Sequence, residues 1–116
     1  MTHVAVLLHI EKEFATAVHA LSLGNDGMAR VCARRAAGVA IQWWCEHSSQ
    51  QLLSTDAMTL LHFLHNDKSF SEKSRAAAMR LTVKITLQFT SPYPTNPIED
   101  AKIIIAEIEE KILSRT

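Results

Sequence analysis

Apolar residues recur along the first part of the chain at the spacing of α-helices. At 100° per residue, one apolar stripe marks a first helix that begins at the N-cap Thr2 and ends near Leu23, and a second stripe marks a helix from about Met28 to Ser48. The sequence GNDG separates them, because Gly and Asn tolerate the left-handed backbone in which helices end. The inward side of the first helix is expected to consist of Leu7, Ile10, Phe14, Val18 and Leu21.

Two further helices are marked by their start signals. The segment DAMTLLHFLH, residues 56–65, predicts a short helix capped by Ser54 or Thr55. Near the C-terminus, three prolines in SPYPTNP break the chain. A last helix then runs over residues 97–113, with Asn96 as its N-cap and acidic residues in its first turn.

The stretch LTVKITLQFT, residues 81–90, alternates apolar and polar residues as a half-buried β-strand does. No other segment alternates in this way, and an unpaired strand leaves its backbone groups without partners. Ser69 and Glu72 have the spacing of a capping box just upstream. We therefore predict a helix over residues 70–89 that is apolar on two faces. The alternative is an edge strand paired across a dimer.

Together these elements predict an all-α protein, an antiparallel up-and-down bundle of four long helices and one short helix. The length of 116 residues suits a single domain. Twelve basic side chains balance twelve acidic ones, which argues against a general nucleic-acid or membrane-surface binder. No apolar run approaches the ~20 residues that span a bilayer, and the N-terminal segment lacks the pattern of a signal peptide. The two cysteines, Cys32 and Cys45, fit a reducing cytoplasm.

Two of the expected helices carry a second apolar face. On the second helix this face contains Ile41 and Trp44, and on the fourth it contains Leu81, Ile85 and Phe89. A bundle of this size can bury one such face per helix, and leaving the other in water forfeits about 25 cal/mol per Å² of apolar area. We therefore predict a homodimer in which these residues pair across a two-fold axis.

The densest cluster of charge is formed by Arg30, Arg34 and Arg35. Arginine forks match phosphate oxygens, so these side chains are candidates for contacts with a phosphate or nucleotide. The alternative is a solvated helix face, with Arg35 in line with Glu46 for an ion pair. No glycine-rich phosphate-binding loop accompanies the cluster.

Two histidines, His62 and His65, share one face of the short helix and are weak candidates for metal ligands. The chain lacks the HExxH, CxxC and Glu-x-x-His motifs that accompany such sites. We therefore expect polar surface or interface residues here, with no metal and no cofactor. Cys32 lies on an apolar stripe and Cys45 adjoins Glu46, which favours structural thiols over nucleophiles.

Three segments resemble the HEPN family of small helical-bundle domains. GNDGMARVCARRAAGVAI is similar to the family's glycine-containing turn and Ala-rich second helix, and TLLHFL is similar to its middle helix. SPYPTNPIEDAKIIIAEIEEKI resembles its Tyr-Pro turn, acidic first turn and final helix. The resemblance covers residues 4–113. It implies a dimeric bundle and a nucleotide or a nucleotidyltransferase as the partner.

Many members of that family are metal-independent ribonucleases, often toxins, which use an Arg followed a few residues later by a His. This chain departs from that motif: no Arg stands at the required distance before His47, His62 or His65, and QFTSPYP occupies the preferred place. We therefore assign no catalytic residue. The sequence predicts a non-catalytic HEPN-like module that binds a nucleotide or a partner protein. A divergent toxin-type ribonuclease, and a small adaptor or antitoxin-like bundle, are the alternatives.

Overall fold

The computed structural model describes residues 2–48, 54–83 and 96–114. Over these residues the chain is helical and contains no strand, which confirms the prediction of an all-α bundle. The helices are α1 (His3–Ser22), α2 (Asp26–His47), α3 (Ala57–Asn66), α4 (Glu72–Thr82) and α5 (Pro97–Leu113).

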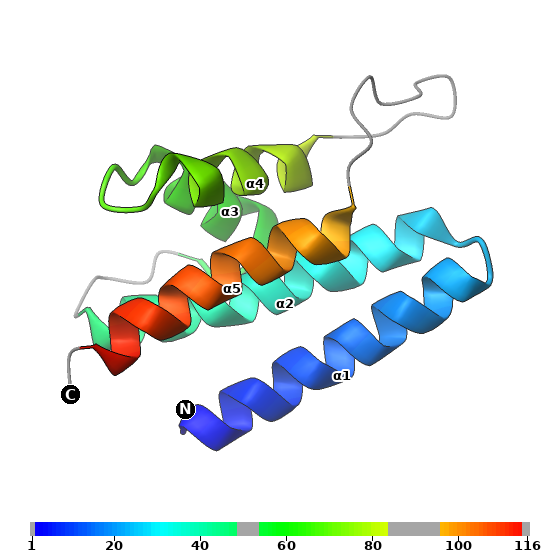
Figure 1. Ribbon diagram of the computed structural model, residues 1–116, viewed down its shortest axis with the longest axis horizontal. Helices are drawn as coiled ribbons and strands as arrows, with labels where there is room; N and C mark the ends of the chain where they lie inside the picture. The colour runs from blue at the N-terminus through cyan, green and yellow to red at the C-terminus, as the bar shows by residue number, and fades with distance from the viewer. Residues whose placement is uncertain (1, 49–53, 84–95, 115–116) are drawn as a thin grey trace.

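Helix α2 lies at the centre of the arrangement. It packs against α1, α3 and α5. Helix α4 packs against both α3 and α5, so that α2, α3, α4 and α5 form a closed ring. Helix α1 lies outside this ring and packs to any extent only against α2 among the described helices. Figure 1 shows α1 antiparallel to α2. One side of α1 is therefore left without a neighbouring helix from the described part of the chain.

Local start and stop signals fix most helix ends as predicted. The Thr2 side chain accepts a hydrogen bond from the backbone N–H of Ala5 at the start of α1. Gly24, between α1 and α2, has a φ of 75°, the left-handed conformation that glycine adopts without strain. Asn96 caps α5, and Pro97 occupies its first turn. These caps depend on residues close together in sequence.

Two predicted caps are wrong. Helix α3 is capped by Asp56 rather than by Ser54 or Thr55, and its carboxylate accepts from the N–H of Thr59. Helix α4 is capped by Ser71 rather than by Ser69. In both cases the residue nearer the helix has the extended backbone and the acceptor side chain that an N-cap needs.

The helix predicted over residues 70–89 is shorter than expected. It ends at Thr82, and Val83 has an extended backbone, with φ −69° and ψ 128°. Residues 84–89 lie outside the described residues. Within the part that is described, α1, α2 and α5 are long, whereas α3 and α4 have 10 and 11 residues. The carbonyl groups at the end of α4 bind side chains of α2, so they need no further helical turn.

The expected dimer surface is buried within one chain. Ile41 and Leu81 have no exposed surface and Trp44 is 4% exposed, because α2 is covered on both sides and α4 closes the ring. Ile85 and Phe89 lie outside the described residues. The second apolar face of α2 therefore exists, but helices of the same chain cover it.

Small residues allow this close packing of α2. A Cβ atom placed on Gly38 would lie 3.3 Å from the Cβ of Ala57 on α3, which is tighter than ordinary contact. The two helices therefore cross at a point where α2 has no side chain. Trp43, Leu61 and Ile104 are among the largest side chains that the core buries completely.

Helix α1 buries a narrower face than predicted. Val6, Ile10, Ala17 and Ala20 face α2, whereas Val18 is 56% exposed and Leu21 is 37% exposed. The prediction that Val18 and Leu21 point inward is wrong, because α1 has a single helical neighbour and small alanines make that contact. No helix among the described residues is long and apolar enough to cross a membrane.

Candidate functional site

The arginines of the candidate phosphate site hold the end of α4. Arg30 donates a hydrogen bond to the carbonyl oxygen of Arg80 at 3.0 Å. Arg34 donates from Nε to the carbonyl oxygen of Leu81 at 2.6 Å and from a terminal nitrogen to that of Val83 at 3.2 Å. The end of a helix leaves its last carbonyl groups without a partner from a further turn. Of the three, the carbonyl oxygen of Arg80 also accepts from the backbone N–H of Val83 at 3.4 Å. Two arginines of α2 therefore act as a C-terminal cap for α4.

Burial lowers the pKa of both arginines. For Arg30 the nearby carboxylate of Asp100 opposes this effect, and for Arg34 the positive charge of Arg30 adds to it. An arginine stays protonated over the ordinary pH range even so. The two cations lie close together at the negative end of the α4 dipole, where positive charge is favoured.

An ion pair joins α4 to α5 in the same region. Arg80 donates from Nε and from a terminal nitrogen to one oxygen of Asp100, at 3.0 and 2.8 Å. Asp100 is 5% exposed and lies in the first turn of α5. Sequence reasoning placed Asp100 only at a helix start, and Arg80 was missed because its partner is 20 residues away.

Arg35 does not belong to this cluster. It is exposed, and its positive charge lowers the pKa of the Cys32 thiol, although burial and Glu13 raise that pKa more. Burial likewise raises the pKa of Cys45, followed by the charges of Asp67 and Glu46. Both thiols are free and buried, and a raised pKa opposes formation of the reactive thiolate.

The two candidate metal ligands, His62 and His65, have different surroundings. His62 is exposed, whereas the ring Nδ1 of His65 lies 3.1 Å from the carbonyl oxygen of Arg75 on α4. Arg75 donates in return to the carbonyl oxygen of His65 at 2.8 Å. This reciprocal pair fastens α3 to α4. Within residues 2–48, 54–83 and 96–114, no group of three or more potential ligands could hold a metal ion.

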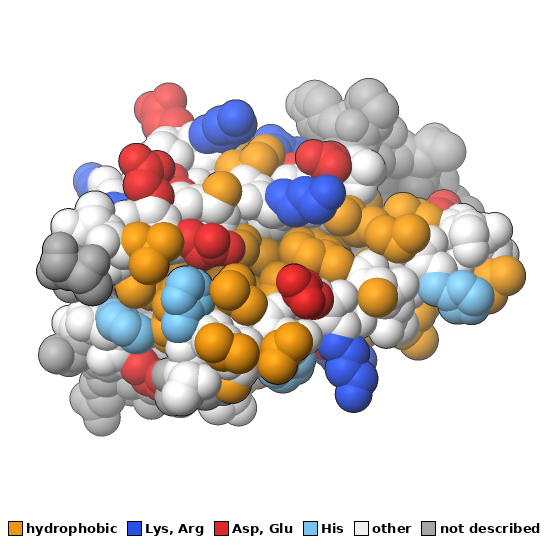
Figure 2. Space-filling model, turned by 60° about the horizontal axis from the view of Figure 1, so that its bottom comes forward, with side chains coloured by type: hydrophobic (Ala, Val, Ile, Leu, Met, Phe, Trp, Pro, Cys, Tyr) orange, Lys and Arg blue, Asp and Glu red, His pale blue; other side chains and the backbone are white. Residues whose placement is uncertain are grey.

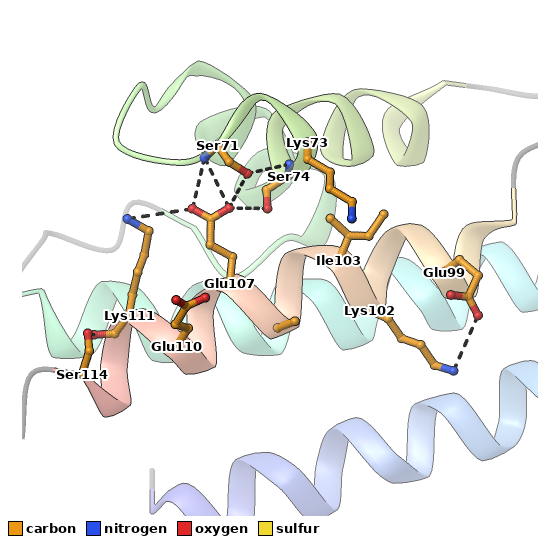
Figure 3. Close-up of a pocket in the computed structure, with 11 residues that line it drawn as sticks. Ser71, Lys73, Ser74, Glu99, Lys102, Ile103, Glu107, Glu110, Lys111 and Ser114 are labelled. Atoms are coloured by element: carbon orange, nitrogen blue, oxygen red, sulfur yellow. Dashed lines mark hydrogen bonds and ion pairs between the residues drawn. The ribbon is translucent and has the colours of Figure 1, made fainter.

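The start of α4 is held by a carboxylate from α5. Glu107 accepts hydrogen bonds from the hydroxyl groups of Ser71 and Ser74, each at 2.6 Å, and from the backbone N–H of Ser71 at 3.1 Å. Figure 3 shows its carboxylate pointing from α5 to the first turn of α4. Negative charge is favoured at a helix N-terminus, so Glu107 complements the arginines at the other end of α4.

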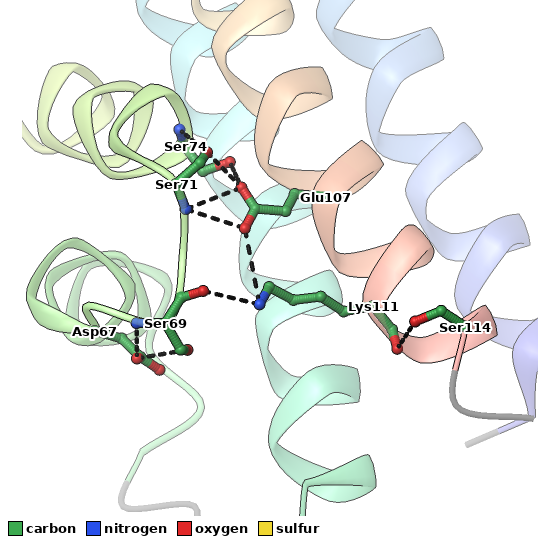
Figure 4. Close-up of polar contacts among 7 residues, drawn as sticks. All are labelled: Asp67, Ser69, Ser71, Ser74, Glu107, Lys111 and Ser114. Carbon is green, nitrogen blue, oxygen red and sulfur yellow. Dashed lines mark hydrogen bonds and ion pairs between the residues drawn. The ribbon is translucent and has the colours of Figure 1, made fainter.

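The pKa of Glu107 reflects these contacts. Burial raises it, but the hydrogen bonds from Ser71 and Ser74 and the positive charge of Lys111 together lower it below its ordinary value. The Lys111 ammonium lies 3.9 Å from the carboxylate and donates to the carbonyl oxygen of Ser69 at 2.9 Å (Figure 4). It also lies over the ring of Phe70, 4.8 Å from the centroid, a cation–π contact.

An open groove of about 630 Å³ adjoins this contact. Lys73, Lys102 and Ile103 line it together with acidic residues, and Figure 3 shows basic and acidic side chains interspersed along α5. A Ser–Glu contact lies beside it, but a carboxylate with a lowered pKa is a poor general base. The groove therefore has neither the single sign of charge of an anion site nor an activated nucleophile.

Several of the most exposed large apolar side chains among the described residues lie on α1. Val4 is 67% exposed, Leu8 61% and Val18 56%. A second groove, of about 650 Å³, runs between α1 and α5, where Phe14 faces Ile98. Figure 2 shows apolar side chains forming a band across this face, with charged side chains among them. Singly exposed apolar residues are ordinary, whereas a contiguous area indicates a surface for interaction.

Comparisons with family models, with curated proteins and with solved structures find no match to this chain. The site is therefore defined by its own geometry. The charged residues that sequence reasoning selected, Arg30 and Arg34, serve the packing of α4. The apolar residues Val4, Leu8 and Val18 of α1, which it placed in the core or left unassigned, are exposed.

Proposed function

We propose that this chain is a non-catalytic, HEPN-like helical module that works as a homodimer and binds a partner protein. The observation that carries this proposal is the uncovered apolar face of α1, with Val4, Leu8 and Val18 each more than half exposed. Full burial of one such side chain is worth roughly 1.5–3 kcal/mol. Association that covers this face therefore has a substantial driving force.

A protein partner is favoured over a nucleotide by the use of the arginines. A phosphate site needs guanidinium groups that are open to the ligand. Here Arg34 donates both of its described hydrogen bonds to carbonyl groups at the end of α4, those of Leu81 and Val83, and Arg30 donates to a third. The resemblance to the HEPN family is the reason to place a nucleotidyltransferase among the partners to be tested. Two free, buried cysteines support a cytoplasmic location for the module.

Light scattering of the purified protein tests the homodimer. We expect a dimer at tens of micromolar, since weak specific complexes have dissociation constants of about 1 µM or more. Combining Leu8→Glu with Val18→Glu places charge on the exposed face without touching the core, so the variant is expected to be a folded monomer. The matched control is Met79→Glu on α4. The Met79 side chain is apolar and 44% exposed, and α4 does not pack against α1 to any extent. A monomeric wild-type protein at these concentrations would overturn the proposed dimer.

A further inference from the structure

The exposed side of α1 has the residue spacing of a coiled-coil seam. Six exposed positions follow one another at intervals of 4, 3, 4, 3 and 4 residues, and these positions are Val4, Leu8, Glu11, Ala15, Val18 and Ser22. Alternating intervals of 3 and 4 are the spacing of the a and d positions of a heptad. The stripe, which we name the α1 seam, lies roughly 150° around the helix from the face that packs on α2, at 100° per residue.

The spacing of the residues in the α1 seam is symmetric about its centre. Because the intervals read the same from either end, a second α1 in antiparallel orientation matches it position for position. Leu8 then lies opposite Val18 of the second copy, Val4 opposite its Ser22, and Glu11 opposite its Ala15. A large residue meets a smaller one in each pair, which suits the packing of knobs into holes.

Charge selects the same orientation. In a parallel pair, Glu11 would lie opposite Glu11 of the second copy, and two like charges would meet at the centre of the seam. In the antiparallel pair, Glu11 lies about 4.5 Å along the axis from Lys12 of the second copy, at 1.5 Å per residue. Two acidic and two basic groups then gather near the two-fold axis and balance.

Building on the proposed dimer, we infer that the occupant of the α1 seam is α1 of a second copy of this chain, antiparallel and centred near residue 13. The flanks of the seam agree with this choice. Phe14 lies beside the seam and lines the groove toward α5, where Ile98 and Lys102 extend the surface. The second copy therefore covers the groove as well as the helix.

The size of the contact sets the strength that we expect. Helix α1 has 20 residues, so it is about 30 Å long and about 10 Å wide. A footprint of roughly 300 Å² is below the ~800 Å² per partner of a standard interface, and the groove adds to it. The dimer is thus expected to be weak and reversible, and measurements belong at tens of micromolar and above.

Cysteine cross-linking tests the orientation. We propose two single variants, Leu8→Cys and Val18→Cys, in a chain whose native cysteines are 1% and 3% exposed and therefore protected. In the antiparallel register the two new thiols face each other across copies, so mixing the variants is expected to give a covalent heterodimer. Within either variant alone, equivalent positions lie about 15 Å apart along the axis, beyond the ~7 Å that a disulfide allows between Cα atoms.

The outcomes separate the inference from the function on which it rests. Preferential cross-linking in the mixture supports the antiparallel seam, whereas rapid cross-linking within each variant alone would establish a parallel pair and overturn it. A dimer in light scattering with no cross-link above that of Met79→Cys would overturn the seam and leave the proposed dimer standing. A monomeric wild-type protein in light scattering would overturn both the antiparallel seam and the proposed dimer.

A charge exchange gives a second, independent readout. Glu11→Lys places four basic groups near the two-fold axis and is expected to weaken the dimer about tenfold. Adding Lys12→Glu restores the balance of charge and is expected to recover the wild-type dissociation constant. Failure of the second substitution to restore association would contradict the antiparallel placement of Glu11 near Lys12.

Discussion

Glu107 offers the sharpest test of how the short helix α4 is held in place. Its carboxylate, 19% exposed as a side chain, receives two serine hydroxyl groups at 2.6 Å and one backbone N–H at 3.1 Å. Hydrogen bonds to charged groups contribute about 1.5–3 kcal/mol each. Glu107→Gln keeps one acceptor oxygen but loses the charge, so we expect the free energy of unfolding to fall by about 2 kcal/mol. For a domain of this size the melting temperature would fall by roughly 8 °C.

The dependence on pH distinguishes a charged contact from simple packing. The pKa of Glu107 is lower in the folded protein than the value of about 4.3 in an unfolded chain. Its stabilisation is therefore fully present above the unfolded pKa and is lost as the pH falls through the folded pKa. The difference in unfolding free energy between wild type and Glu107→Gln should shrink between about pH 6 and about pH 3.

Chemical denaturation at several pH values measures both quantities. The matched control is Glu110→Gln, because Glu110 lies one turn away on α5 and lines the same groove, yet it is exposed. We expect the control to change stability by less than about 0.5 kcal/mol, as ordinary surface substitutions do. If both variants lose the same stability, or if the loss with Glu107→Gln is independent of pH, the reasoning about this carboxylate is wrong.

Three further predictions concern α2 and the alternative function. Arg34→Ala should lower the unfolding free energy by about 2–3 kcal/mol, because carbonyl groups at the end of α4 lose their donors, and Arg34→Lys should not restore it. Gly38→Val should destabilise by about 1–3 kcal/mol in thermal unfolding, since its side chain would overlap Ala57. Purified protein should not cleave RNA without metal; cleavage that His62→Ala abolishes would support the ribonuclease alternative.

The elements that sequence could predict are those defined by neighbouring residues. Thr2 and Asn96 cap the helices that follow them, and Gly24 ends the turn after α1 in the left-handed conformation. Each of these depends on hydrogen bonds or backbone geometry within a few residues. Helical periodicity likewise identified the helices, because an apolar stripe is a local pattern.

Sequence could not predict where α4 ends, because the cause is distant in the chain. The acceptors at its C-terminus meet donors that are 47 and 50 residues away. A local signal did exist: β-branched Thr82 and Val83 weaken helix propensity at this point. That signal is too weak to decide the matter without the arginines, since packing commonly overrides propensity.

The candidate site likewise combines contacts between neighbouring residues, which the sequence displays, with contacts between distant residues, which it does not. Glu107 and Lys111 have the spacing of a helical ion pair, which the sequence displays, but the serines that Glu107 binds are 33 and 36 residues away. Which apolar face is covered is likewise a question of topology. Ile41 is buried because α2 is central, and Val18 is exposed because α1 has one neighbour.

The distribution of charge bears on where a partner can bind. Glu107 holds the start of α4, while Arg30 and Arg34 hold its end, so the most concentrated charges of the ring serve its internal packing. A charge that is engaged in this way resists recruitment by a ligand, because its withdrawal would leave helix ends unsatisfied. Helix α1 is under no such constraint: it packs mainly on α2, so we expect substitutions on its outer side to leave the ring of α2, α3, α4 and α5 intact. Association through α1, with a second copy of this chain as the occupant that we propose, is therefore the arrangement in which function and stability of the bundle conflict least. The engagement of Arg30 and Arg34 at the end of α4 in turn supports the proposal of a protein-binding module over a nucleotide site at these arginines.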